Sequence, residues 1–534
     1  MTSAHKTRLS LPEVAVLGLF VALAMLTLAW IGWSSLVGER IWSGAIGPAV
    51  DSMQYLSWIR ESAFHGLIGN RFQLGPVDRV FLHPAIVVSA GLHRLGVSIP
   101  IAYALWVPVG LVVLCLGVTA YLRRLVAGAW PRAAALALAL LATAPMLLDL
   151  ARWIAPEGRS ARFIVFDSWP INWLWGYPLT AISVGLACLV LLGVERGRKS
   201  ARITPLLPLG ALLCAWLQPW QGAILIAVVF SGELLAKVQA TNDQQEASAG
   251  RWRMLAPTLI AGALPMAYYA ILGIADPSWH EHGIQDNLYE STIPWWSVPL
   301  VLSPLLLPAL VTLWRRQPSY QLRAAQLWVA FAVALFAFIQ ITGVGTFASH
   351  SMQGISVPLA ALAVLGVQDL AQRFGRRPVL AIAVIGLAVM VVPGVVTSTE
   401  RQVAKIRAVN SGYFVKQGED RALAALAADP RPGGVLAKVR LGSQVPWRTG
   451  RSSWLGHESW TPQFIHRSFV AGMIFSSSEP QADGRSMAAA RATGASFMLA
   501  DCERTPAAAV ETSGAALSRF GCASITELDR AGKR

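Results

Sequence analysis

The feature that most constrains this chain is a series of long apolar runs, separated by short segments that carry basic residues. A run of about twenty apolar residues is long enough to cross a bilayer as a helix. We count eleven such runs when the stretch 205–237 is divided into two. They cover residues 11–36, 99–122, 131–150, 177–194, 205–237, 254–274, 295–314, 322–341, 352–370 and 378–397. The sequence therefore predicts an α-helical polytopic membrane protein.

Composition supports this class and excludes others. The chain has 534 residues, of which 54% are hydrophobic and only 14% are charged, which a soluble core does not explain. The formal net charge of +15 would suit a nucleic-acid-binding protein. Many of the basic residues lie in short loops between apolar runs, however, where they orient a protein in the membrane. We therefore expect no nucleic-acid partner.

The positions of the basic residues also predict the topology. Lys6 and Arg8 precede the first run, which is too long for a signal-peptide core and is followed by no clear cleavage site. The N-terminus should therefore be cytoplasmic, and the loop after the first run should lie outside. Basic residues then occur at each inner turn, beginning with Arg123 and Arg124. Counted in this way, the C-terminal part of the chain lies outside.

One stretch decides whether this count holds. Residues 205–237 are too long for one regular span and are interrupted by Q-P-W-Q-G at 218–222. We interpret them as two short helices joined by a turn, because non-helical backbone at membrane depth is tolerated where it lines a protein cavity. A single kinked helix would invert everything that follows. Arg251 and Arg253, in the polar stretch after this segment, favour the two helices.

From about residue 399 the sequence becomes typical of a soluble domain. We divide the chain into a transmembrane domain, residues 1–398, and an extracytoplasmic α/β domain, residues 399–534. In the latter we predict helices at 420–428, 484–494 and 506–520, and strands at 434–439, 496–500 and 523–528. Cys502 and Cys522 flank the last predicted helix. An oxidising compartment would let them form a disulfide, although the helix could equally hold them too far apart.

The first outer loop contains the most informative carboxylate. Asp51 lies about fifteen residues past the end of the first run. The apolar residues of 52–64 fall mostly on one side of a helix, as expected for a helix in a membrane surface, and 85–95 is a second such segment. Asp51 is thus expected at the boundary between water and lipid. Alternatively, Asp51 is only the N-cap of the helix, a role that is compatible with a functional one.

Short catalytic signatures are absent from the sequence. It contains no Walker loop, no H-E-x-x-H, no paired C-x-x-C and no G-x-S-x-G. His280 and His282 are the candidate metal ligands, but two clustered histidines without a cysteine do not indicate a metal site. The sequence therefore identifies no cofactor with certainty, and it leaves a divalent metal open without indicating one. Acidic residues inside the apolar runs are sparse, which makes a proton-coupled transporter the weaker hypothesis.

Several stretches resemble the GT-C class of integral-membrane glycosyltransferases, in particular its poorly characterised bacterial members. The matching stretches are D-S-M-Q-Y-L-S-W-I-R-E-S-A-F-H-G from Asp51, the following F-L-H-P, the Q-P-W-Q-G break, F-A-S-H-S-M-Q-G-I-S-V-P-L-A around His350, and V-P-W-R-T-G-R-S-S-W-L-G-H-E-S-W-T-P. The order of surface segments, spans and C-terminal domain is also similar. Many relatives of the protein O-mannosyltransferase type have Asp-Glu where this chain has Asp51 and Ser52. The resemblance therefore leaves a second carboxylate unassigned.

The resemblance implies transfer of a hexosyl or pentosyl group from a polyprenyl-phosphate donor to a glycan, lipid or protein acceptor, at the outer face of a bacterial cytoplasmic membrane. Asp51 would be the general base, with Asp167 in the second outer loop as the fallback. Basic groups must hold the departing phosphate, and the outer-face candidates are Arg60, Arg71, Arg79, His83 and His350. Arg79 and His83 are spaced i, i+4 and could face one way on a helix. The alternative function is a flippase or transporter of a lipid-linked or small solute.

Overall fold

The computed structural model describes residues 8–38, 40–144, 166–173, 176–200, 204–238, 242–290, 297–315, 319–408, 411–476, 480–502 and 517–528. The chain forms two compact units. Unit 1 comprises Met1–Leu26, Trp106–Ile271 and Asp286–Val403. Unit 2 comprises Thr27–Leu105, Leu272–Gln285 and Ala404–Arg534, so it groups the first predicted outer loop with the C-terminal residues. The sequence-based boundary at residue 398 remains a proposal.

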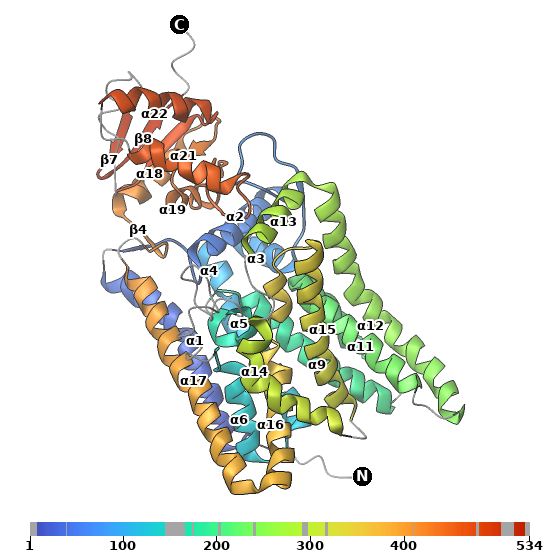
Figure 1. Cartoon of the computed structure of the whole chain (residues 1–534). Coiled ribbons are helices and arrows are strands. Elements are labelled where there is room, and N and C mark those ends of the chain that lie inside the picture. Colours follow the sequence, from blue (N-terminus) through green and yellow to red (C-terminus); the bar gives the residue numbers. More distant parts are fainter. Residues whose placement is uncertain are drawn as a thin grey trace. The chain divides into compact units, whose positions relative to one another are not determined.

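A helix lies in every apolar run that we predicted to cross the membrane (Figure 1). Among the described residues, seven helices are long and apolar enough to do so. They are α1 (Leu11–Val37), the continuous pair α4 (Ile99–Ala104) and α5 (Trp106–Leu125), α9 (Pro178–Ser200), α11 (Pro219–Val238), α12 (Asn242–Ala275), α15 (Tyr320–Thr342) and α17 (Arg376–Arg407). The remaining predicted runs contain α6 (Ala129–Leu140), α10 (Leu206–Leu217), α14 (Ser297–Leu310) with η4 (Val311–Trp314), and α16 (Ser356–Phe374). Residues 145–150 of the third run lie outside the described residues. The chain is a multi-pass membrane protein.

Close helix packing in unit 1 depends on small residues. Helices α5 and α9 pack along their lengths, and Gly117 faces Gly185 across the contact. A Cβ atom added at Gly185 would lie 2.5 Å from the carbonyl oxygen of Val113. Glycine lets the two backbones approach, as is common where helices pack inside a membrane.

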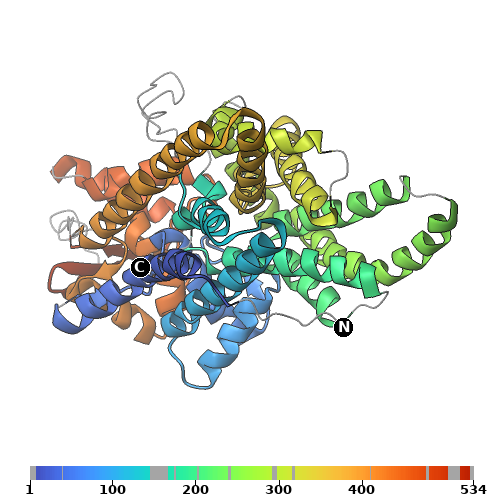
Figure 2. The same ribbon diagram turned by 90° about the horizontal axis from the view of Figure 1, so that it is seen from below.

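The predicted break in residues 205–237 is confirmed. Gln218 is extended, with φ −147° and ψ 100°, and it separates α10 from α11. The two helices pack against each other, and Gly222 lies against Ala215. Helix α12 then lies beside α11 (Figures 1 and 2), with the Phe230 and Trp252 rings 5.3 Å apart.

Ion pairs join helix ends in unit 1. Arg124 at the end of α5 binds Glu195 near the end of α9, and Arg198 binds Glu233 near the end of α11. Arg315 after η4 donates to Asp369 of α16 at 2.7 and 2.8 Å. Each pair joins ends that our topology count assigns to the same side of the membrane. The alternation of the spans is therefore consistent with these contacts.

Unit 2 contains the first outer loop. Its elements are β1 (Ile41–Trp42), α2 (Ala49–His65), β2 (Ile68–Gly69), β3 (Arg79–Phe81) and α3 (Pro84–Arg94), and α13 (Pro277–Glu290) begins in the same unit. The two predicted surface segments are both helical. Only Phe64 and His65 of α2 are exposed, so protein covers this helix on most sides instead of on one. Helix α3 has exposed apolar side chains at Val87 and Val88, as expected for a helix at a membrane surface.

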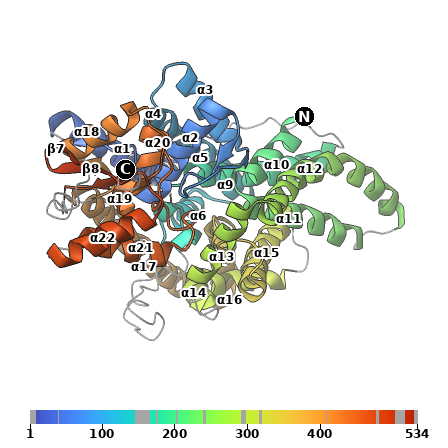
Figure 3. The ribbon, with the colours of Figure 1, turned by 90° about the horizontal axis from the view of Figure 1, so that it is seen from above.

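The C-terminal part of unit 2 is built around a four-stranded sheet with the order β5-β6-β8-β7. The strands are β5 (Val435–Leu436), β6 (Phe497–Ala500), β7 (Leu517–Phe520) and β8 (Ala523–Glu527); β5 and β6 are parallel, and the other neighbours are antiparallel. Side chains of β6 alternate between two cores. Met498 packs towards α21 (Phe464–Ser476) and α22 (Pro480–Ala492), and Leu499 packs towards α18 (Gln417–Ala428). Helices thus cover both faces of the sheet (Figures 1 and 3).

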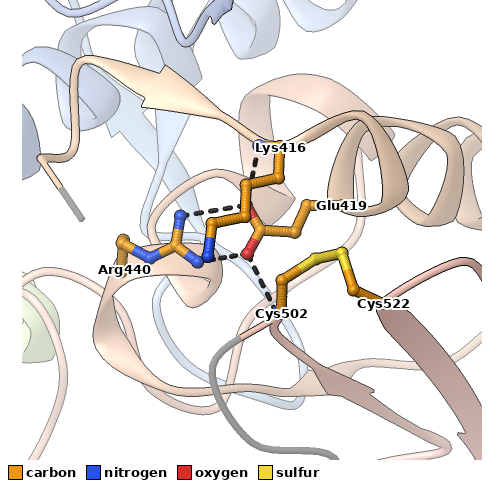
Figure 4. Close-up of a disulfide and its surroundings, with 5 residues drawn as sticks. All are labelled: Lys416, Glu419, Arg440, Cys502 and Cys522. Atoms are coloured by element: carbon orange, nitrogen blue, oxygen red, sulfur yellow. Dashed lines mark hydrogen bonds and ion pairs between the residues drawn. A yellow bond between two sulfur atoms is a disulfide. The ribbon is translucent and has the colours of Figure 1, made fainter. Parts of the chain in front are cut away.

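The short elements of this part complete unit 2. Strand β4 (Phe414–Val415) pairs with β1, and α19 (Val439–Gly442) and α20 (Val445–Thr449) follow β5. A buried carboxylate, Glu419 of α18, accepts hydrogen bonds from the backbone N–H groups of Lys416 and Cys502 at 3.0 and 3.1 Å and also binds Arg440 (Figure 4). Cys502 and Cys522 are joined by a disulfide beside it.

One predicted element of this part is wrong. We expected a helix over 506–520, but residues 517–520 form strand β7, and 503–516 lie outside the described residues. Strand β7 pairs with β8 through a two-residue turn in which Gly521 has φ +66°. Pairing with β8 places residues 517–520 in a strand instead of at the end of a helix.

Candidate active site

Asp51 lies in the first turn of α2 and is not its N-cap. The N-cap is Pro48, and Asp51 occupies the third helical position. The alternative interpretation of Asp51 as a capping residue is therefore wrong. A carboxylate in the first turn still interacts favourably with the helix dipole.

The partner of the Asp51 carboxylate comes from the C-terminal part of the chain. Nε2 of His457 lies 3.1 Å from Oδ1 of Asp51. Nδ1 of the same ring accepts a hydrogen bond from the backbone N–H of Ser459 at 3.1 Å. A backbone N–H can only donate, so Nδ1 carries no proton and Nε2 donates to Asp51. The two contacts together determine the tautomer and the orientation of the ring.

A compact loop presents His457 to Asp51. The Thr461 N–H donates to the His457 carbonyl at 2.9 Å, and the Gly456 N–H donates to Oγ1 of Thr461 at 3.1 Å. A Cβ atom at Gly456 would lie 2.8 Å from Cε1 of Phe72, so only glycine allows the loop to pack here. We call residues 456–461 the His457 loop.

Two other segments of unit 2 hold the His457 loop. Asn70 donates to the Trp460 carbonyl at 2.9 Å, and Gln285 of α13 donates to the Thr461 carbonyl at 3.1 Å. The Trp460 ring stacks on His282 at 4.2 Å and meets the edges of Trp58 and Trp279 at 5.6 and 5.0 Å. The loop therefore belongs to a packed aromatic cluster beside Asp51.

Two further ionisable groups respond to the charge of Asp51. The pKa of the Tyr55 phenol is raised because it is buried and because Asp51 is negative. The pKa of Glu458 is raised because protein atoms crowd its carboxyl group and because of Asp51, while His457 acts in the opposite direction. Glu458 is nevertheless the one exposed residue of the His457 loop. A second carboxyl group thus lies within the electrostatic reach of Asp51.

The arginines proposed for phosphate binding lie elsewhere in unit 2. Arg71 and Arg79 both pair with Glu61 of α2, at 2.7 and 3.0 Å. Arg60 donates to the Trp447 carbonyl at 3.2 Å, and burial and the charge of Arg71 lower its pKa. Arg60 and Asp51 are nine residues apart on one helix, which corresponds to about 13 Å along the axis and opposite faces. The structure does not gather these arginines around Asp51.

His83 does not share a helix with Arg79. Arg79 lies in strand β3, and His83 is the N-cap of α3. The expectation that their i, i+4 spacing places them on one face of a helix is therefore wrong. His83 is buried, and its ring lies 6.0 Å from that of Phe81. The strand forms because residues 79–81 pair with β2, which a local helical spacing does not reveal.

Unit 1 contains a second pair of a carboxylate and a histidine. Asp167 lies in η3 (Phe166–Ser168), and its Oδ2 is 3.4 Å from Nε2 of His350 in η5 (Ala348–Met352). The His350 ring packs on Trp220 at 4.6 Å. The structure thus brings together the fallback base and one of the proposed phosphate-binding residues.

The two candidate metal ligands do not share a site. His280 is exposed, and its Nδ1 lies 3.3 Å from the Gly273 carbonyl, whereas His282 stacks on Trp460. Within the described ranges, no group of three or more histidine, cysteine, aspartate or glutamate side chains could hold a metal ion.

Sequence reasoning missed His457, Glu458 and Tyr55. The stretch G-H-E-S-W-T-P was part of the family resemblance, yet no role was predicted for its residues. Polar residues next to tryptophan and proline, in a segment without helical or strand periodicity, were the available signal. Their partner Asp51 is 406 residues away from His457, beyond the reach of any local pattern.

Comparisons with known proteins identify the fold. No protein-family model and no curated protein sequence matches the chain. Among solved structures, the archaeal oligosaccharyltransferase AglB from Archaeoglobus fulgidus, in complex with an inhibitory peptide and a dolichol-phosphate, is similar with a TM-score of 0.51 and 12% identity, covering 92% of this chain and 69% of AglB. ArnT from Cupriavidus metallidurans gives a TM-score of 0.46 in the apo state, at 13% identity and over 98% and 99% of the two chains. With undecaprenyl phosphate bound, ArnT gives 0.42, at 13% identity and over 98% and 100%.

Proposed function

We propose that this chain, which has the GT-C fold of membrane glycosyltransferases, transfers a sugar from a polyprenyl-phosphate donor to an acceptor hydroxyl. The proposed place is the outer face of a bacterial cytoplasmic membrane. The observation that carries the proposal is the Asp51 carboxylate, held by His457 in the segment that follows the first span. A carboxylate fixed in this way is suited to accept the proton of an incoming hydroxyl.

The reaction requires few groups. Asp51 takes the proton from the acceptor hydroxyl, and the acceptor oxygen forms a bond to the anomeric carbon of the donor sugar. The bond from that carbon to the phosphate oxygen breaks, and the polyprenyl phosphate departs with the electron pair. A lipid phosphate is a good leaving group that stays in the membrane, so the reacting carbon must lie at its surface.

The departing phosphate needs cationic neighbours. Among the residues proposed for this role, Arg71 and Arg79 already neutralise Glu61, and they also hold the chain that follows α2. Arg60 donates to the Trp447 carbonyl, and His350 pairs with Asp167. The assignment of Arg60, Arg71, Arg79, His83 and His350 to the phosphate remains a proposal, to be tested by substitution one at a time.

The purified protein, assayed with a panel of polyprenyl-phosphate sugars, tests the function. We expect that one donor releases its polyprenyl phosphate only when an acceptor with a free hydroxyl is present. Omission of the acceptor is the matched control. If no donor is consumed, and the protein in vesicles instead moves the lipid-linked sugar between leaflets, the chain is a flippase and the proposal is wrong.

A further inference from the structure

We propose that His457 is a positioning residue of the transfer reaction, through which the C-terminal part of the chain fixes the catalytic carboxylate of the first outer loop. This inference rests on the proposed function of Asp51. It adds a residue to the site, and it gives the loop at 456–461 a role in turnover.

The exposure of the two side chains separates their roles. The Asp51 side chain is 22% exposed, so a substrate can reach it, whereas the His457 side chain is 5% exposed and is enclosed by protein. A buried imidazole is poorly placed to touch the substrate. It is well placed to hold one oxygen of a carboxylate in a constant direction.

The hydrogen bonds of the ring determine how it acts. Because Nδ1 accepts from the Ser459 N–H, protonation of Nδ1 would remove that hydrogen bond and bring two N–H groups together. The Nε2–H group is therefore the one that faces Asp51. It donates to Oδ1 of Asp51 and restricts rotation of the carboxylate.

Several hydrogen bonds around the His457 loop indicate that the fold itself holds His457 against Asp51. The His457 loop is closed by its own hydrogen bonds and is held by Asn70 from the first outer loop and Gln285 from α13. Phe72 covers His457 with the ring centres 5.9 Å apart. Three segments that are distant in sequence thus converge on the ring that contacts Asp51.

Two substitutions separate the positioning role from a structural one. In His457→Asn, the shorter side chain can still accept the Ser459 N–H, in the geometry of an Asx-turn, but it does not reach Asp51. In His457→Gln, the amide nitrogen extends about as far as Nε2 and can again donate to Asp51, while the turn is weakened. Ser459→Ala keeps the backbone N–H that bonds His457 and is the control for a change of side chain in the loop.

We expect His457→Asn to lower the thermal midpoint only by the small contribution of the lost hydrogen bond to Asp51, and to lower kcat roughly ten- to hundredfold, because the carboxylate is no longer oriented. KM should change little, since the ring does not contact the substrate. His457→Gln should recover part of kcat despite a lower thermal midpoint, and Ser459→Ala should resemble the wild type. If kcat instead follows the thermal midpoint across the three variants, the role is structural and the inference is wrong.

A measurement without substrate keeps this inference separate from the proposed function. Chemical denaturation of Asp51→Ala, His457→Asn and the double variant gives the coupling between the two side chains, and we expect non-additive shifts of the midpoint. Additive shifts would overturn the contact itself. Coupling together with a wild type that transfers no sugar would contradict the proposed function and, with it, the positioning role of His457 in turnover.

Discussion

At the scale of single residues, the candidate site depends on how side chains near Asp51 accommodate its charge. His457 donates a hydrogen bond to it, and Tyr55 remains a protonated phenol next to it. Glu458 is the group that the charge disfavours, because a second ionised carboxyl near Asp51 costs electrostatic energy. This difference leads to a prediction about stability and pH.

Glu458→Gln should raise the thermal midpoint at pH 7. The pKa of Glu458 is raised in the folded state, so the stability it contributes is complete below its unfolded pKa, about 4.3, and is lost as the pH rises through the folded pKa. The wild type therefore carries an unfavourable charge at pH 7 that glutamine removes. Thermal unfolding of both proteins at pH 7 and near pH 4 measures the effect. The gain should disappear near pH 4, and a loss of stability at pH 7 would contradict the assigned direction.

At the scale of secondary-structure elements, the start of α18 depends on one buried carboxylate. Burial alone would raise the pKa of Glu419, but the bonds from Arg440, Lys416 and Cys502 outweigh it and lower this pKa. Glu419 thus links the first turn of α18 to the disulfide region (Figure 4). An element held in this way should respond to acid.

Glu419→Gln should destabilise unit 2 at pH 7, because it removes the buried negative charge that the Arg440 guanidinium binds. Removal of one partner from a buried pair costs on the order of 3 kcal/mol. Since the pKa of Glu419 is lowered, its contribution is present above the unfolded pKa and is lost as the pH falls through the folded pKa. Denaturant unfolding across pH should show a difference that shrinks in acid. A difference of the same size at every pH would rule out the ion pair as its cause.

The elements also show what could be predicted from the sequence. Apolar runs predicted the membrane helices, and Gln218 with Pro219 predicted the break between α10 and α11, because these are local signals of length and backbone geometry. The strand at 517–520 was missed because four residues are too few to show an alternating pattern after an alanine-rich segment. Gly521 in the two-residue turn was the usable signal for that hairpin.

For the candidate site, too, local features could be predicted from the sequence and long-range contacts could not. The position of Asp51 after the first span was readable, because it depends only on the order of segments along the chain. The contact with His457 was not, because it depends on packing between residues 406 positions apart. The pairing of Arg71 and Arg79 with Glu61 likewise required the folded loop, since spacing alone suggested a cluster of phosphate-binding cations.

At the scale of the whole molecule, the orientation in the membrane remains a prediction. Ion pairs in unit 1 join helix ends that the sequence assigns to one side, which supports the alternation of the spans. The excess of basic residues at these ends predicts that this side is the cytoplasm. The C-terminal residues of unit 2 would then face the outside.

Labelling of single cysteines in intact cells tests this orientation. Ser518 and Ser200 are both exposed serines, one in β7 and one at the end of α9. A membrane-impermeant maleimide should label Ser518→Cys in intact cells and label Ser200→Cys only after permeabilisation, with the wild type as the background. The reverse pattern would place the proposed active site on the cytoplasmic side.

Asp51 is the proposed base of the sugar transfer, and one substitution tests this role directly. Asp51→Asn preserves the shape of the side chain and leaves an oxygen that can accept from His457, so the protein should fold normally. Turnover of the active polyprenyl-phosphate sugar should fall on the order of a hundredfold or more, because the amide cannot accept the acceptor proton. Asp167→Asn, measured in parallel, should cause a smaller loss. Full turnover in Asp51→Asn together with its loss in Asp167→Asn would move the chemistry to the pair of Asp167 and His350 and contradict the role of Asp51 as the base.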